Sequence, residues 1–155
     1  MRSFGGLLMD ASSDDSRAYR RALVQTLQRD GHLHSARAAD ALLAVPREVF
    51  VPGVALPDVY CPSEAIVTKR LAGVSVSSAS APEVIALMLE QLDPQPGQRV
   101  LEIGAGTGYN AALLAHMVGE TGDVVTVDID EDLVLSAREH LSTAGCKQVT
   151  VVQSD

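Results

Sequence analysis

Apolar positions in the first part of the chain follow helical spacing. The spacing predicts a helix over residues 16–29, with Ser16 as its N-cap. A second helix is predicted over residues 35–44 and ends before Pro46, because the residue that precedes a proline is disfavoured in helical conformation. The proline-rich stretch 46–82 instead predicts extended loops and short strands rather than helix.

From residue 82 onward, helical spacing alternates with short apolar strands. Ser80 is the predicted N-cap of the first of these helices, and Pro82 lies in its first turn. The predicted elements are, in order, the helix PEVIALMLEQL, the strand RVLEI, the helix YNAALLAHMV, the strand DVVTVDI, the helix EDLVLSAREHLSTAG and the strand QVTVVQ. Strands that alternate with helices of this length indicate βαβ units and a parallel sheet. We therefore expect an α/β, Rossmann-like fold with an N-terminal region of helices and loops.

Composition narrows the class of protein. With 155 residues the chain is expected to form one domain. Its net charge of −8 argues against nucleic acid as a partner, because phosphate binding requires clustered Lys and Arg. No apolar run approaches the roughly 18 residues of a membrane span, and we expect no secretory signal. Neither the two cysteines, Cys61 and Cys146, nor the histidines have metal-ligand spacing, so we expect no metal site and a cytoplasmic location.

Three glycines, Gly104, Gly106 and Gly108, lie between the strand RVLEI and the helix after it. In an open parallel sheet, ligands bind beyond the carboxyl ends of the strands, where such loops lie. Glycine there allows a sharp turn and a close approach of the backbone to a ligand. Asp128 ends the next strand, at a position from which a carboxylate accepts hydrogen bonds from ribose hydroxyls. The pair of features predicts a ligand that contains adenosine, in preference to a tight turn without a ligand.

Glu102 distinguishes between two such ligands. The dinucleotide fingerprint G-x-G-x-x-G would place its third glycine at the position of Tyr109. A carboxylate at Glu102 would repel an anionic pyrophosphate, whereas it would attract an α-amino group. S-adenosylmethionine has the ammonium group and lacks phosphates. The sequence therefore favours S-adenosylmethionine over NAD.

The sequence VLEIGAGTGYNAALLA resembles the first motif of class I methyltransferases, and most closely that of the protein-L-isoaspartate (D-aspartate) O-methyltransferase family. The stretch VPREVFVP is similar to the family signature V-P-R-E-x-F-V-P. The stretch SASAPEVIALMLEQL is similar to the family's T-I-S-[QA]-P loop and following helix, which puts Ser80 and Pro82 on the family's serine and proline. The resemblance extends from about residue 35 to the end of the chain.

This resemblance implies S-adenosylmethionine as cofactor and a set of cofactor-binding residues: Glu102, Gly104, Gly106, Gly108, Asp128, Ile129 and Asp155. Asp128 would hold the ribose hydroxyls, and Ile129 would pack near the adenine. Asp155 matches an acid that reaches the adenine amino group in the family. The loop around Ser80, the candidate catalytic residue, would lie over the sulfonium and help to position the substrate carboxylate. Arg47 would either face that carboxylate or anchor its turn through an ion pair.

The chain departs from the family pattern at three places. The family's Tyr-x-Asp segment is replaced after Tyr60 by CPSEAIVTK, and Ser78 and Ala79 replace the threonine and isoleucine of T-I-S. The chain stops at Asp155, where the family's chains continue through further strands and helices, so we expect the C-terminal part of the core to be missing. The segments AIVTK and VSSAS are similar to those of bacterial relatives that methylate aspartate in ribosomally made peptides.

The predicted function is S-adenosylmethionine-dependent methyl esterification of an aspartyl or isoaspartyl carboxylate in a peptide or protein. Residues 1–92 would supply helices and capping loops, and residues 93–155 the first half of the cofactor-binding core. Protein repair and tailoring of one dedicated peptide both remain open. The alternatives are a catalytically inactive cofactor-binding or interaction module and, less favoured, an NAD-dependent oxidoreductase. Because RVLEI would have a bare edge, we also expect a homo-oligomer or a further segment that completes the sheet.

Overall fold

The computed structural model describes the backbone of residues 5–155 and the side chains of residues 14–155. Its first helix, α1 (Gly5–Arg29), begins well before the predicted start at Ser16. Ser16 is therefore not an N-cap: it lies inside the helix, where its hydroxyl accepts a hydrogen bond from Arg20 and donates one to Glu48. These partners satisfy the hydroxyl, so it does not compete for the helix backbone.

The second helix, α2 (Ala36–Ala44), agrees with the prediction. Ser35 is its N-cap, and its hydroxyl accepts a hydrogen bond from the Ala38 N–H at 3.3 Å. The next segment contains two short helices that the sequence did not predict, η1 (Arg47–Phe50) and α3 (Leu56–Val59). Pro57 lies in the first turn of α3, where its missing N–H costs nothing, so a proline there starts a helix.

The predicted short strands form a separate antiparallel hairpin, β1 (Ile66–Leu71) and β2 (Val74–Ala79). Helix α4 (Pro82–Leu92) follows. Its N-cap is Ala81, without a side-chain hydrogen bond, so the prediction of Ser80 as the cap was wrong by one residue. The Ser80 hydroxyl is not used to start the helix.

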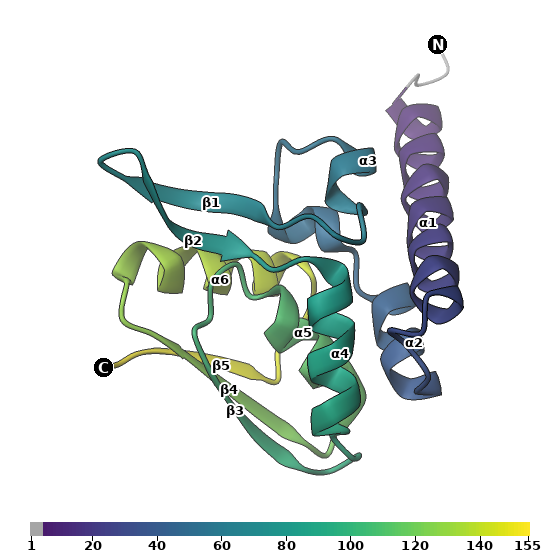
Figure 1. Cartoon of the computed structure of the whole chain (residues 1–155). Coiled ribbons are helices and arrows are strands. Elements are labelled where there is room, and N and C mark those ends of the chain that lie inside the picture. Colours follow the sequence, from purple (N-terminus) through teal and green to yellow (C-terminus); the bar gives the residue numbers. More distant parts are fainter. Residues whose placement is uncertain (1–4) are drawn as a thin grey trace.

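The C-terminal part confirms the predicted alternation of strands and helices (Figure 1). Its elements are β3 (Arg99–Ile103), α5 (Tyr109–Val118), β4 (Asp123–Asp128), α6 (Glu131–Thr143) and β5 (Val149–Gln153). The three strands are parallel and lie in the order β3-β4-β5, so β3 is an edge strand in the described chain. The expectation that another copy or segment pairs with this edge stays a prediction.

The two faces of this sheet differ. Val124 and Thr126 point to the face that α5 and α6 cover, and both are fully buried. Leu101 and Ile103 point to the opposite face and are 64% and 84% exposed. Glu102 is the register partner of Thr126 and hydrogen-bonds to it, so this candidate site residue lies on the covered face.

One hydrophobic core joins the N-terminal helices to the sheet, and it includes Leu27, Phe50, Leu89, Leu113 and Val124. The predicted division after residue 92 falls between α4 and β3 and stays a prediction. Within the described residues, no helix is both long and apolar enough to cross a membrane.

Candidate active site

The glycine loop between β3 and α5 has two open positions and one packed position. Gly104 and Gly106 have φ of 94° and 51°, and a Cβ at either would meet no atom within 4 Å. Gly108 also has a positive φ, 87°, but a Cβ there would lie 3.2 Å from Leu141 Cγ and 3.3 Å from the Ala137 carbonyl oxygen. The first two glycines thus expose bare backbone, whereas the third allows α5 to pack against α6.

Glu102 lies on the penultimate position of β3, and protein groups fix both of its carboxylate oxygens. Asn110 Nδ2 donates to Oε1 at 2.7 Å, and Thr126 Oγ1 donates to Oε2 at 2.5 Å. Burial raises the pKa of Glu102, these two hydrogen bonds oppose that effect, and the charge of Asp128 adds to it. Among the side chains of residues 14–155, no Lys, Arg or His lies within 4.0 Å of this carboxylate.

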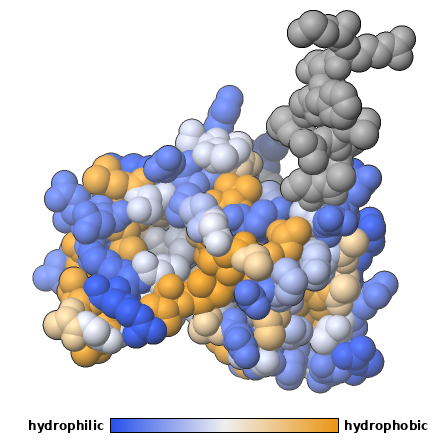
Figure 2. Space-filling model, turned by 90° about the horizontal axis from the view of Figure 1, so that it is seen from above, coloured by the Kyte–Doolittle hydropathy of each residue, from blue (hydrophilic) through white to orange (hydrophobic). Residues whose placement is uncertain are grey.

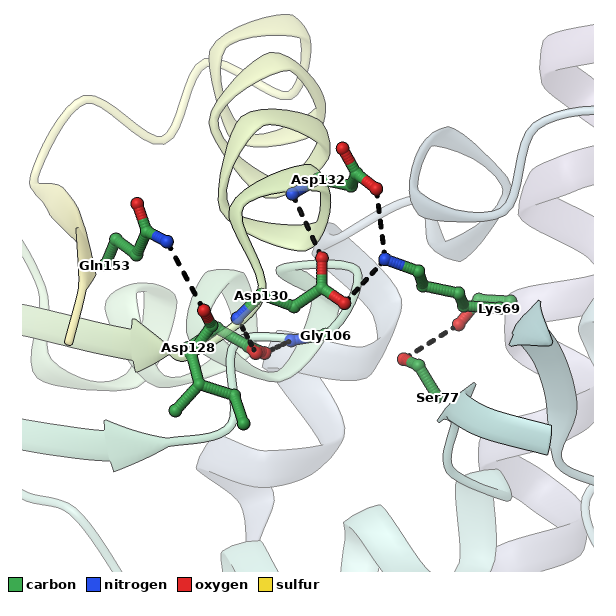
Figure 3. A network of polar contacts seen from close by, with 9 residues as sticks. Lys69, Ser77, Gly106, Asp128, Asp130, Asp132 and Gln153 are labelled. Carbon is green, nitrogen blue, oxygen red and sulfur yellow. Dashed lines mark hydrogen bonds and ion pairs between the residues drawn. The ribbon is translucent and has the colours of Figure 1, made fainter. Parts of the chain in front are cut away.

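Asp128, at the end of β4, is held by backbone N–H groups (Figure 3). Its Oδ1 accepts from the Asp130 N–H and its Oδ2 from the Gly106 N–H, both at 3.1 Å. Each oxygen keeps a second lone pair for another donor. The carboxylate therefore joins the glycine loop to the start of α6.

The remaining predicted residues lie at the same edge of the sheet. Ile129 follows Asp128 and is 71% exposed, an unusual position for a large apolar side chain. The Ser154 N–H donates to the Asp128 carbonyl oxygen at 3.1 Å, and this bond places the exposed Asp155 beside the end of β4. An exposed apolar side chain and a carboxylate thus lie next to Asp128.

A cavity of about 300 Å³ opens beside the glycine loop. It brings together four of the predicted residues, Ser80, Glu102, Gly104 and Gly106. Gly108, Asp128, Ile129 and Asp155 do not line it, and the last three lie at the ends of the neighbouring strands. Its other walls include Arg47, Ser78, Tyr109 and Asn110.

Several buried polar atoms around this cavity have no protein partner. In the described part of the chain they include Arg47 Nη1, Tyr109 Oη and Asn110 Oδ1, all on residues that line the cavity. Buried polar atoms are almost always hydrogen-bonded, so a cluster of exceptions indicates a polar partner such as water or a ligand.

Arg47 anchors the loop that carries Ser80. Its side chain is fully buried, Nε donates to the Val59 carbonyl oxygen and Nη2 to that of Ser80, both at 2.9 Å, and Cζ lies 4.9 Å from the ring centroid of Tyr109. Burial lowers the pKa of Arg47. Arg47 thus serves as an anchor, but the predicted ion pair was wrong, because the partners of Nε and Nη2 are carbonyl oxygens. Nη1 has no protein partner, so the alternative that Arg47 faces a substrate carboxylate stays a prediction. Glu48 instead contacts Arg20, at 3.7 Å.

Sequence reasoning missed the residues that support Glu102. Thr126 is the register partner of Glu102 in the parallel ladder, and Asn110 lies in the first turn of the helix after the loop. Placing the predicted strands RVLEI and DVVTVDI side by side from their first residues would have put Thr126 opposite Glu102. His140 on α6 is half-buried, with Nδ1 3.0 Å from the Thr107 carbonyl oxygen in the glycine loop.

These features define a Rossmann-like α/β fold of the class I methyltransferase type, as the sequence predicted. A family model described as protein-L-isoaspartate (D-aspartate) O-methyltransferase matches residues 18–155. The chain belongs to this family, whose methyltransferases use S-adenosylmethionine. The resemblance drawn from its motifs is confirmed.

Individual relatives agree with this assignment. The chain is 39% identical over 136 residues to a protein-L-isoaspartate O-methyltransferase of Methanopyrus kandleri, which covers 86% of this chain and 58% of the relative. It is 39% identical over 144 residues to the enzyme of that name from Aeropyrum pernix, covering 90% and 52%. The chain thus spans somewhat more than half the length of these curated relatives.

Two solved structures have the same fold. One, a protein-L-isoaspartate O-methyltransferase, is 35% identical, with a TM-score of 0.78 over 88% of this chain and 42% of that chain. The other is a Plasmodium falciparum protein assigned to the same activity and solved in complex with S-adenosyl-L-homocysteine. It is 20% identical, with a TM-score of 0.73 over 87% and 62%, and it bears on the fold alone.

Proposed function

We propose that this chain forms the cofactor and methyl-transfer site of an S-adenosylmethionine-dependent O-methyltransferase that esterifies aspartyl or isoaspartyl carboxylates in peptides or proteins. The observation that carries the proposal is Glu102: a desolvated carboxylate beside open glycine backbone, with no cationic side chain of the described residues near it. A buried charge without a partner is unfavourable, so the site suits a ligand that brings a cation.

The residues fit the parts of S-adenosylmethionine. Glu102 would pair with the α-ammonium group, and the open backbone at Gly104 and Gly106 would lie against the amino-acid part and the ribose. Asp128 would accept hydrogen bonds from the ribose hydroxyls with its second lone pairs. In this proposal Gly108 supports the loop by packing rather than by contact with the cofactor.

The adenine end has a matching pair of residues. The exposed side chain of Ile129 would cover one face of the ring, and its exposure supports that role because burial under a ligand would remove it from water. Asp155 would accept a hydrogen bond from the adenine amino group. Tyr109 stands where a dinucleotide site has its third glycine, and with Glu102 it argues against NAD.

Methyl transfer to a carboxylate requires little acid–base chemistry. The nucleophile is ionised at neutral pH, and the bound cofactor supplies an activated methyl group on a sulfonium. The chain's own residues would orient the carboxylate oxygen and exclude water. Ser80 lines the cavity beside Glu102, and Arg47 fixes its carbonyl oxygen, so its hydroxyl is positioned to orient the nucleophile.

The two parts of the chain would then divide the work. Residues 1–92 supply the hairpin and the Ser80 loop that cover the site, and residues 93–155 supply the cofactor-binding strands and loops. We place the protein in the cytoplasm, acting on proteins or peptides that carry isoaspartyl or aspartyl residues. Repair of damaged proteins and tailoring of one peptide use the same chemistry at this site.

Titration calorimetry with S-adenosylhomocysteine and with NAD tests the ligand class. We expect saturable binding of S-adenosylhomocysteine and none of NAD at the same concentrations. Binding of NAD alone would favour an oxidoreductase.

Turnover needs a second assay, because cofactor binding without methyl transfer is the behaviour of an inactive module. The methyl group of S-adenosylmethionine is followed into a synthetic peptide with one isoaspartyl residue, and into the same peptide with an ordinary aspartyl residue. Ester formation on either peptide supports the proposal, and the ratio of the two rates identifies the preferred carboxylate. Binding without ester on either peptide would leave only the binding module.

A further inference from the structure

The β1–β2 hairpin covers the glycine loop from outside the main sheet (Figure 1). The cavity beside Glu102 is walled by Ser78 and Ala79 at the end of β2. A second cavity, of about 330 Å³, lies between β1 and α6; it is lined by Ile66, Val67 and Thr68 and shares Gly106 and Thr107 with the first. The position of the hairpin therefore sets the walls of both cavities.

The hairpin is weakly tied to the rest of the molecule. Its side-chain hydrogen bonds from Thr68 to Ser77 and from Arg70 to Gly73 stay within the hairpin. Much of its apolar surface is exposed, including Leu71, Val74 and Val76. Figure 2, seen from above, shows such apolar side chains interspersed with hydrophilic ones on this face of the molecule. An element with few buried contacts opens at low free energy.

Within the described residues, Lys69 makes all of the side-chain hydrogen bonds and ion pairs between the hairpin and the rest of the chain. Its Nζ lies 2.5 Å from Asp130 Oδ2 and 3.0 Å from Asp132 Oδ2, at the start of α6 (Figure 3). The side chains of Lys69 and Asp130 are only 20% and 27% exposed, whereas that of Asp132 is 80% exposed. The contact with Asp130 is therefore the better shielded of the two.

Asp130 links Lys69 to the proposed ribose site through further hydrogen bonds. Its Oδ1 caps α6 by accepting from the Asp132 N–H at 3.0 Å, and its own N–H donates to Asp128 Oδ1. Asp128 in turn accepts from the Gly106 N–H. A continuous series of hydrogen bonds thus runs from the hairpin through the helix start to the glycine loop.

We infer that Lys69 is a positioning residue: it fastens the β1–β2 hairpin over the cofactor site through Asp130 and so slows release of the cofactor without touching it. The inference rests on the proposed function, because it names S-adenosylmethionine and its product as the ligand that is retained. Electrostatic attraction supplies the fastening, so it weakens with salt.

The test compares Lys69→Met with Arg70→Met, which removes the neighbouring cation whose hydrogen bond stays in the hairpin. Release of S-adenosylhomocysteine from the 155-residue chain is measured by stopped-flow, through the signal of a fluorescent analogue that exchanges with it. We expect the release rate to rise about fivefold or more in Lys69→Met, in the range of typical coupling between sites. Arg70→Met should stay within about twofold of the parent, and Lys69→Arg should restore slow release.

A double-mutant cycle identifies the partner. Asp130→Asn keeps a good N-cap and removes the charge. It should raise the release rate as Lys69→Met does, and the double variant should be no faster than either single one. Equal release rates in Lys69→Met and Arg70→Met, or additive effects in the double variant, would overturn the inference.

Amide hydrogen exchange in the ligand-free chain separates this outcome from failure of the proposed function. Lys69→Met should speed exchange in residues 66–79 and leave α5 unchanged. If Lys69→Met shows this faster exchange but the parent binds no S-adenosylhomocysteine, the proposed function fails and the role in cofactor retention falls with it. If the parent binds the ligand while exchange and release are unaffected, the hairpin inference alone fails.

Discussion

The carboxyl ends of β3 and β4 carry the same functional group in different surroundings. Glu102 on β3 is bound by the side chains of Asn110 and Thr126, and burial raises its pKa. Asp128 on β4 is bound by the backbone N–H groups of Gly106 and Asp130 and is half-exposed. Both side chains are half-buried, and neither carboxylate lies within 4.0 Å of a cationic side chain of the described residues. They differ in their partners, side chains for Glu102 and backbone N–H groups for Asp128, and in the raised pKa of Glu102.

In the proposed function, this difference would let adjacent parallel strands recognise two ends of one ligand. A desolvated carboxylate interacts most strongly with a full positive charge, because little water screens the pair. A carboxylate that is fixed by the backbone and open on one side is suited to accept hydrogen bonds from neutral hydroxyls. We therefore propose that the ammonium binds at the end of β3 and the ribose at the end of β4.

The largest expected effect follows from Asp128→Ala. Two hydrogen bonds to a charged acceptor would be lost, each worth about 1.5–3 kcal/mol, so affinity for S-adenosylhomocysteine should fall by about a hundredfold or more. Titration calorimetry measures the change. Asp123→Ala, which removes a carboxylate at the opposite end of the same strand, is the matched control and should bind normally. An affinity of Asp128→Ala within threefold of the parent would refute the ribose assignment.

Glu102→Gln should have the next largest effect. It keeps the shape and one acceptor but removes the charge, so the loss of a charge-assisted contact should weaken binding about tenfold or more. The exposed Glu139→Gln on α6 changes net charge equally and should have no effect. If both glutamine variants bind alike, the ammonium does not pair with Glu102.

Ser80→Ala separates chemistry from binding. If the hydroxyl orients the substrate carboxylate, kcat should fall about two- to tenfold, as for loss of one ordinary hydrogen bond, while cofactor affinity hardly changes. The measurement is methyl transfer to an isoaspartyl peptide, with the thermal midpoint as a control. Because Ala81 rather than Ser80 caps α4, the midpoint should not change. A large drop in midpoint with normal kcat would assign Ser80 a structural role.

The pH dependence of stability gives a smaller effect with a definite sign. The pKa of Glu102 is raised in the folded chain, so between the ordinary and the raised value the folded state binds more protons than the unfolded state. The ligand-free chain should therefore lose stability as pH rises through that window.

Pairing with an ammonium favours the ionised form, so the stabilisation by S-adenosylhomocysteine should grow with pH over the same window. Thermal melts of the parent and of Glu102→Gln, with and without ligand, measure both trends. Glu102→Gln should lose the pH dependence of both. A ligand-induced shift that is independent of pH in the parent would contradict the pairing.

Much of this arrangement could be predicted from the sequence because it depends on local signals. Alternating strands and helices predicted the order of the C-terminal elements, and the acids Glu102 and Asp128 near the strand ends indicated the two proposed recognition points. Helix ends were less predictable where side chains have distant partners: Ser16 hydrogen-bonds to Glu48, 32 residues away, and does not cap α1.

Long-range contacts account for the rest. The ion pair between Lys69 and Asp130 joins residues 61 positions apart, and no local pattern specifies it. The fully buried Arg47 is held by the carbonyl oxygens of Val59 and Ser80. Every residue type has a backbone carbonyl oxygen, so the side chains at these positions do not specify the contact. Such contacts depend on the tertiary arrangement, so motif spacing indicated the anchor but not its partners.

The most direct test of the division between the two strand ends compares two ligands. S-adenosylhomocysteine carries both the ribose and the ammonium, whereas 5′-methylthioadenosine carries the ribose but no ammonium. Calorimetry should show that Glu102→Gln weakens S-adenosylhomocysteine about tenfold or more and leaves 5′-methylthioadenosine within about twofold, while Asp128→Ala weakens both ligands by a similar factor. Equal losses for the two ligands in Glu102→Gln would contradict the account.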